Sequence, residues 1–121
     1  VPVVCISGDG GALYTISELA TAARHKIPIR WIIFNDNAFG NVRRFQIEKN
    51  NNRPIASDLK SPDFAKLAES FGVKGLRAKT PTELRHCLRD SFASGGPTVI
   101  EVPVGDFPSP WEFILMPKIR N

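Results

Sequence analysis

The fold is decided by the stretch PVVCISGDGG, residues 2–11. An apolar, β-rich run that ends in Gly-Asp-Gly-Gly and precedes a helical pattern predicts a buried strand, a tight turn and a helix start. Asp9 is therefore expected at the carboxyl end of a strand, the edge of an open α/β sheet where ligands bind. Glycine on either side of it lets the backbone approach a phosphate and leaves amide groups free to donate.

A second stretch, IRWIIFNDNAFG at residues 29–40, has the same form and places Asp36 where another apolar strand ends. Asp9 and Asp36 lie 27 positions apart, which is the length of a strand–helix–strand step. In neighbouring parallel strands the two carboxylates would meet at one edge of the sheet. Such a pair suits Mg²⁺, which takes one or two carboxylates and shares its other positions with water and phosphate oxygens.

The rest of the chain alternates helices and strands. Thr15-Ile16-Ser17-Glu18 is interpreted as a capping box, so Glu18 is expected to cap a helix and not to serve as a catalytic glutamate. Further expected elements are a short helix at 41–49, an asparagine-rich loop at 50–54, a helix with Ser61 as N-cap closed by Gly72, a strand at 73–78, a helix opened by a capping box at Thr80 to Glu83, and a strand at 97–102. This alternation predicts a three-layer α/β fold with a mainly parallel sheet.

Gly8-Asp9-Gly10, followed at a distance by Asn35-Asp36, resembles the thiamine diphosphate signature of the acetolactate synthase and benzoylformate decarboxylase group of enzymes. The stretches at 16–24 and 37–44 resemble that group as well. The resemblance implies the thiamine-diphosphate-binding fold, and it matches only the C-terminal, diphosphate-binding domain of such enzymes. We therefore expect residues 1–104 to be that domain, beginning inside its first strand as a fragment that is incomplete at the N-terminus.

The resemblance also implies the roles of individual residues. Asp9, Asp36 and the backbone carbonyl of Ala38 are expected to bind Mg²⁺. The cofactor, thiamine diphosphate, is expected to lie against Gly8, Asp9, Gly10, Gly11, Asn35, Asp36, Ala38, Phe39 and Gly40. Arg43 and Arg44 either help to hold an anionic group or form surface ion pairs. No residue of the chain is expected to be catalytic, because the family places its catalytic glutamate in the pyrimidine-binding domain.

The implied function is decarboxylation and acyl-anion transfer on a 2-oxo acid, as in acetolactate synthase. The missing pyrimidine-binding domain would lie in the same chain or on a second subunit of a homodimer or homotetramer. A decarboxylase or oxidase of the same family, and a stand-alone module that binds the cofactor without catalysis, remain alternatives. A dinucleotide-binding fold is a weaker one, since the third glycine of G-x-G-x-x-G would have to be Leu13.

Composition and charge limit the classes of binding partner that we expect for this chain. The 121 residues have a net charge of +4, but the basic residues are scattered and not clustered with aromatics, which argues against nucleic-acid binding. No apolar run approaches the length of a membrane span, and two cysteines are too few for a metal knuckle or a disulfide framework, so a cytoplasmic protein is expected. Residues 105–121 are rich in aromatics and proline and are expected to pack as a tail on another domain or subunit.

Overall fold

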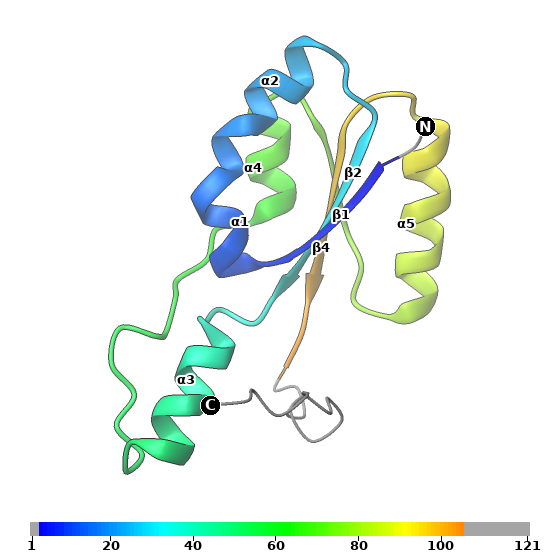
Figure 1. Ribbon diagram of the computed structural model, residues 1–121. Helices are drawn as coiled ribbons and strands as arrows, with labels where there is room; N and C mark the ends of the chain where they lie inside the picture. Colours follow the sequence, from blue (N-terminus) through cyan, green and yellow to red (C-terminus); the bar gives the residue numbers. More distant parts are fainter. Residues whose placement is uncertain (1–2, 106–121) are drawn as a thin grey trace, which may run out of the picture.

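The computed structural model describes residues 3–105, in which helices flank both faces of a four-stranded parallel sheet (Figure 1). The strands are β1 (Val3–Gly8), β2 (Ile29–Asn35), β3 (Lys74–Arg77) and β4 (Thr98–Pro103), in the order β1-β2-β4-β3. The helical elements are α1 (Asp9–Thr15), the 3-10 turn η1 (Ile16–Glu18), α2 (Leu19–Arg24), α3 (Gly40–Lys49), α4 (Phe64–Ser70) and α5 (Pro81–Ala93). The predicted three-layer α/β fold is confirmed.

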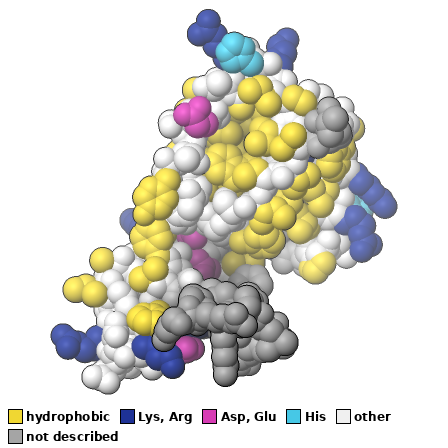
Figure 2. All heavy atoms as spheres, in the orientation of Figure 1, with side chains coloured by type: hydrophobic (Ala, Val, Ile, Leu, Met, Phe, Trp, Pro, Cys, Tyr) yellow, Lys and Arg dark blue, Asp and Glu magenta, His cyan; other side chains and the backbone are white. Residues whose placement is uncertain are grey.

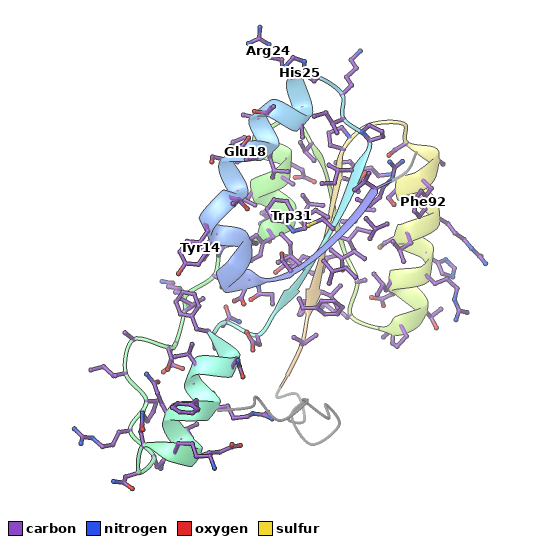
Figure 3. The ribbon with its side chains drawn as sticks, in the orientation of Figure 1. Tyr14, Glu18, Arg24, His25, Trp31 and Phe92 are labelled. Atoms are coloured by element: carbon purple, nitrogen blue, oxygen red, sulfur yellow. The ribbon has the colours of Figure 1, made fainter. Side chains whose placement is uncertain are left out.

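One face of the sheet carries the main core. Helix α1 contacts β1 and β2, and α4 contacts β3 and β4 on the same side (Figure 1). Trp31 lies between the sheet and these helices (Figure 3), and its indole Nε1 donates to Ser7 Oγ at 2.8 Å. The buried cluster on this face consists of Ala12, Leu19, Trp31, Ile33, Phe64, Ala68, Val73 and Val99.

Helix α5 lies alone on the opposite face of the described sheet, where a buried cation joins it to β2 (Figure 1). The Arg30 guanidinium, in a residue only 3% exposed, donates to the carbonyl of Ser91 at 2.8 Å and to that of Pro28. It also lies over the Phe92 ring, 4.9 Å from the centroid (Figure 3). Arg30 therefore binds carbonyls near the C-terminus of α5, where a positive charge is favoured.

Strand β1 was expected to be buried, and this expectation is wrong for the described residues. It forms the edge of the sheet, and Val3, Val4 and Ile6 are 54%, 45% and 65% exposed. Figure 2 shows hydrophobic side chains gathered over this part of the sheet. The reason is that α5 packs on β2, β3 and β4, so within residues 3–105 no helix covers the face of β1 that carries Val4 and Ile6. The apolar run correctly predicted a strand, but it could not reveal what covers it.

The first helix begins earlier than its sequence pattern suggested. Helix α1 starts at Asp9 with Gly8 as its N-cap, and the chain tightens into the 3-10 turn η1 before α2 continues. Thr15 therefore lies at the junction between α1 and η1, where its φ is −130°. Its side chain makes no capping bond. The predicted capping box at Thr15 and Glu18 does not form. At α5 the predicted cap forms at Thr80, whose Oγ1 accepts from the Glu83 amide at 3.2 Å. The return bond of the box is shifted by one residue, because the Glu83 carboxylate accepts from the Lys79 amide at 2.7 Å.

Helix α4 is capped by Asp63, not by Ser61 as predicted. The Asp63 carboxylate accepts from the Lys66 amide at 3.0 Å and forms an ion pair with Arg77 at 2.7 Å. The other end matches the prediction, because Gly72 adopts φ +74° and its amide donates to the carbonyl of Glu69. Such a glycine satisfies carbonyls that the helix leaves free at its C-terminus.

Gly75 of β3 lies against the backbone of α4. A Cβ atom added at this position would clash with the carbonyl oxygen of Ala65, so only glycine permits this close approach. Helix α4 and β3 are therefore in direct backbone contact, and this fixes Asp63 relative to Arg77.

The predicted asparagine loop is also present, with Asn51 and Asn52 both at φ +53°. Asparagine tolerates this left-handed conformation better than most residues. Within residues 3–105 no helix has the length and apolar character needed to cross a membrane. The expected tail at 105–121 lies, apart from Gly105, outside the described residues.

The capping role of Asp63 predicts the stability of two variants. Asp63→Ala should lower the free energy of unfolding by roughly 0.5–2 kcal/mol, the usual effect of losing an N-cap. Asp63→Asn keeps an acceptor for the Lys66 amide but loses the charge next to Arg77, so its loss at neutral pH should be smaller. Denaturant titration of both variants measures the difference, and equal losses would contradict the capping assignment.

The pH dependence of stability separates the same two variants. The hydrogen bond from the Lys66 amide, and then Arg77, lower the pKa of Asp63. A pKa that is lower in the folded chain gives stability that is present above the unfolded pKa and lost as pH falls through the folded value. Asp63→Asn should therefore flatten the acid side of the stability curve. A curve parallel to that of the parent chain would show that Asp63 does not contribute.

Candidate functional site

The first turn of the site joins β1 to α1. Asp9 is the first residue of α1 and is only 1% exposed. Its Oδ2 accepts a hydrogen bond from Ser61 Oγ at 2.5 Å. Ser61 belongs to the segment before α4. The carboxylate is thus held at the carboxyl edge of the sheet, where the sequence predicted it, but with a partner that the sequence did not suggest.

The second turn follows β2 and carries Asp36. The Asn35 side chain accepts from the Asn37 amide at 3.1 Å, and the Asp36 side chain accepts from the Ala38 amide at 3.2 Å. Asn37 lies in the left-handed region at φ +56°, a conformation in which asparagine is well tolerated. The side chains of Asn35 and Asp36 thus each accept from the backbone amide two residues further on, and these two bonds stabilise the turn.

The carboxyl groups of Asp9 and Asp36 lie beside each other. Strands β1 and β2 pair in parallel and end together, with Gly8 opposite Phe34. Partial desolvation of its carboxyl group raises the pKa of Asp36, and the charge of Asp9 and a hydrogen bond with it raise the pKa further. Two neighbouring carboxylates resist being ionised together unless a cation lies nearby. This donor set of hard oxygens fits a divalent cation such as Mg²⁺.

Three glycines make room around the carboxylates. A Cβ atom on Gly40 would clash with Asp36 Oδ2, and one on Gly10 would lie 2.6 Å from the ring of Phe39. At Gly11, in contrast, a Cβ would meet nothing within 4 Å. A side chain at Gly10 or Gly40 would therefore displace Phe39 or the Asp36 carboxylate, whereas Gly11 faces open space.

A hollow of about 340 Å³ lies between the two turns. Eight of the nine residues predicted to contact the cofactor line it, and Asn35 is the exception, because it lies behind the turn. The lining residues are Gly8, Asp9, Gly10, Gly11, Phe34, Asp36, Ala38, Phe39, Gly40, Asn41, Val42 and Val104. The size, the hard oxygen donors and the open space at Gly11 fit a diphosphate with its metal ion.

The segment before α4 supports the site from behind. Phe39 donates its amide to the carbonyl of Ser57 at 2.8 Å, and Leu59 donates to the carbonyl of Asn37 at 2.7 Å. Sequence analysis missed the role of this segment, since Ser61 had been interpreted as a helix cap. A loop that contributes single hydrogen bonds has no spacing pattern by which it could have been recognised.

Two other predictions concern charged residues. Glu18 is exposed on the outer side of the first helical stretch and points away from the sheet (Figure 3). Arg43 forms an ion pair with Asp58 at 2.8 Å, as the surface alternative predicted.

Among residues 3–105 there is no cluster of three His, Cys, Asp or Glu side chains that could hold a metal. A metal here would depend on the two carboxylates and on oxygens from the backbone, water or cofactor.

The fold and the paired carboxylates define an α/β protein with a hollow at the carboxyl edge of its sheet, and the residues there fit an anion with a metal ion. Residues 1–102 match the family described as "Thiamine pyrophosphate enzyme, C-terminal TPP binding domain", and the chain belongs to this family.

Individual relatives agree with this assignment. Acetolactate synthase of Bacillus subtilis (strain 168) is 46% identical over 102 residues, which are 84% of this chain and 18% of that protein. The acetolactate synthase large subunit of Haemophilus influenzae is 40% identical over 92 residues, 75% of this chain and 16% of that protein. The structure of a thiamine diphosphate-dependent 4-hydroxybenzoylformate decarboxylase from Rhodococcus jostii RHA1 matches with TM-score 0.82 and 34% identity, over 89% of this chain and 20% of that one.

The environments of Gly10 and Gly11 predict opposite effects of the same substitution. Gly10→Ala should lower the free energy of unfolding by roughly 1–3 kcal/mol, because the new methyl group overpacks against Phe39. Gly11→Ala adds a methyl group in open space and should stabilise helix α1 by up to about 1 kcal/mol. Denaturant titration compares the two variants, and a Gly11→Ala variant as unstable as Gly10→Ala would be inconsistent with the geometry.

Proposed function

We propose that this chain is the part of a larger enzyme that binds thiamine diphosphate through Mg²⁺, and that the enzyme acts on 2-oxo acids in the manner of acetolactate synthase. The observation that carries the proposal is the pairing of the buried Asp9 with the exposed Asp36 at the head of a glycine-lined hollow. The chain spans about a sixth of the length of the curated relatives that it matches. The activity of the whole protein is therefore inferred from its relatives and from this site.

Asp9, Asp36 and the backbone carbonyl of Ala38 are the proposed protein ligands of Mg²⁺. The two hydrogen bonds that join residues 37–39 to residues 57–59 use the Asn37 carbonyl and the Phe39 amide, so neither occupies the Ala38 carbonyl. This supports Ala38 as the third ligand. Water and diphosphate oxygens would complete an octahedral shell, which Mg²⁺ requires.

Gly10 and Gly11 are the proposed diphosphate contacts, because both line the hollow. Phe39 and Gly40 are proposed to shape the wall of the same hollow. When bound, thiamine diphosphate would supply the nucleophilic carbon and the electron sink that decarboxylation of a 2-oxo acid needs. The residues of this chain hold the cofactor and its metal in place, and none is assigned to proton transfer.

We further propose that a pyrimidine-binding domain supplies the glutamate that acts on the aminopyrimidine ring. It would lie in the same polypeptide or on a second subunit of a homodimer or homotetramer. In this arrangement residues 1–104 are the diphosphate-binding domain, and residues 105–121 pack on a neighbouring domain or subunit. The mass of the natural gene product distinguishes this arrangement from a stand-alone cofactor-binding module.

A simple decarboxylase is the second candidate, and the 34% identity to 4-hydroxybenzoylformate decarboxylase favours it. The identities of 46% and 40% to acetolactate synthases favour carboligation. Incubation of the full-length protein with pyruvate, thiamine diphosphate and Mg²⁺ separates the two. Acetolactate as the product supports the first candidate, and acetaldehyde with CO₂ supports the second.

The metal assignment predicts a graded series of variants. Asp9→Ala and Asp36→Ala should weaken Mg²⁺-dependent binding of thiamine diphosphate by more than roughly a hundredfold, beyond the loss expected from a partner outside the coordination sphere. Asp36→Asn retains a side-chain oxygen and should bind within about tenfold of the parent protein.

Isothermal titration calorimetry on the full-length protein measures these affinities. Asp90→Ala is the matched control, because Asp90 is exposed on α5 and does not line the hollow. Unchanged affinity in both alanine variants would refute the proposed metal site.

A further inference from the structure

Glu101 is a buried carboxylate close to the site but does not line the hollow. It lies on β4, is only 3% exposed, and is the one charged residue of that strand. Its Oε2 accepts from Arg77 Nε at 3.1 Å and from the second Arg77 nitrogen at 2.8 Å. Its Oε1 accepts from Asn35 Nδ2 at 2.8 Å. Burial of a charge is unfavourable unless it is paired and hydrogen-bonded, and here both oxygens are engaged.

The bond to Asn35 connects Glu101 to the turn that carries Asp36. An amide side chain has a donating nitrogen on one side and an accepting oxygen on the other. Because a carboxylate can only accept, Glu101 requires the nitrogen of Asn35 to face it. The oxygen of Asn35 must then face the other way, where it accepts from the Asn37 amide at 3.1 Å.

The orientation of this one amide determines whether the turn is held. If the Asn35 side chain rotated by half a turn, its nitrogen would meet the Asn37 amide, donor against donor. The left-handed conformation of Asn37 would lose the bond that supports it. Asp36 lies between these two asparagines, so its carboxylate would lose its fixed position next to Asp9.

We propose that Glu101, held by Arg77, is a positioning residue that fixes the orientation of the Asn35 amide and thereby the metal-binding turn at residues 35–38. The proposal rests on the proposed function, since it concerns the affinity of that site for its metal and cofactor. Partners that orient metal ligands from outside the coordination sphere typically change affinity or activity by about ten- to a hundredfold. Glu101 touches neither the hollow nor its proposed ligands, so it acts only through Asn35.

Exchanging the donor and the acceptor across the pair tests this directly. In Glu101→Gln, the new amide uses its oxygen for Arg77 and presents its nitrogen to Asn35, so Asn35 is driven to turn its oxygen away from Asn37. In Asn35→Asp, two carboxylates face each other. In the double variant, the nitrogen of the glutamine donates to the new aspartate, whose other oxygen again accepts from the Asn37 amide. The net charge of the double variant equals that of the parent protein.

Calorimetry with thiamine diphosphate and Mg²⁺ on the full-length protein should show affinities lowered about ten- to a hundredfold in each single variant. The double variant should recover to within about threefold of the parent protein, because it restores the pattern of donors and acceptors. Hydrogen–deuterium exchange of the peptide covering residues 34–40, without cofactor, should be faster in each single variant and normal in the double variant.

Asp63→Asn is the matched control. It removes a partner of Arg77 at the far side of the ion-pair network and leaves the bonds of Glu101 intact. It should lower stability without changing cofactor affinity. If it weakens binding as much as Glu101→Gln, the network acts only through general stability and the proposal is wrong.

The outcomes separate the two levels of inference. Parent protein that binds no thiamine diphosphate would refute the proposed function, and the positioning role would fall with it. Parent protein that binds while Glu101→Gln binds equally well would overturn only the positioning role. If a single variant does not fold, the double variant still decides, since the exchange predicts that it folds and binds.

Discussion

The parallel pairing of β1 with β2 is the constraint on which the site depends. Because both strands run the same way and end side by side, the first residues after them must share one edge of the sheet. Asp9 and Asp36 are those residues. Two ionised carboxylates at this edge repel each other, and a divalent cation between them would attract both.

Different segments of the chain hold Asp9 and Asp36 in place. Asp9 is held from one side by Ser61, and Asp36 is held from within its own turn and from behind by Asn35 and Glu101. Ser61 and Glu101 belong to segments that lie far from either turn in sequence. The site is therefore defined by only two short motifs, but its geometry requires nearly the whole described chain.

The sequence predicted the parts of the structure that have a local cause. Apolar runs located β1, β2 and β4, and the short strand predicted at 73–78 contains β3. The glycine at 72 ended α4, and the aspartates at 9 and 36 were found because each directly follows a strand. Prediction failed where distant segments decide the outcome. The helix start at Asp9 replaced a capping box that was locally plausible at Thr15. Asp63 caps α4, whereas the hydroxyl of Ser61, the predicted cap, donates to the distant Asp9. Glu101 did leave a signal, since a lone charge in an apolar strand indicates a buried partner.

The close contact between Gly75 and α4 bears on the entropy of the network. With no side chain between helix and strand, the separation of the Asp63 and Arg77 backbones is set by the packing of α4 on β3, and only the side-chain rotamers remain to be fixed. An ion pair formed on such a fixed frame gives up less conformational freedom than one formed between independently moving elements. Gly75 thus lowers the entropic cost of ordering Arg77, and an ordered Arg77 holds the Glu101 carboxylate of β4 in place.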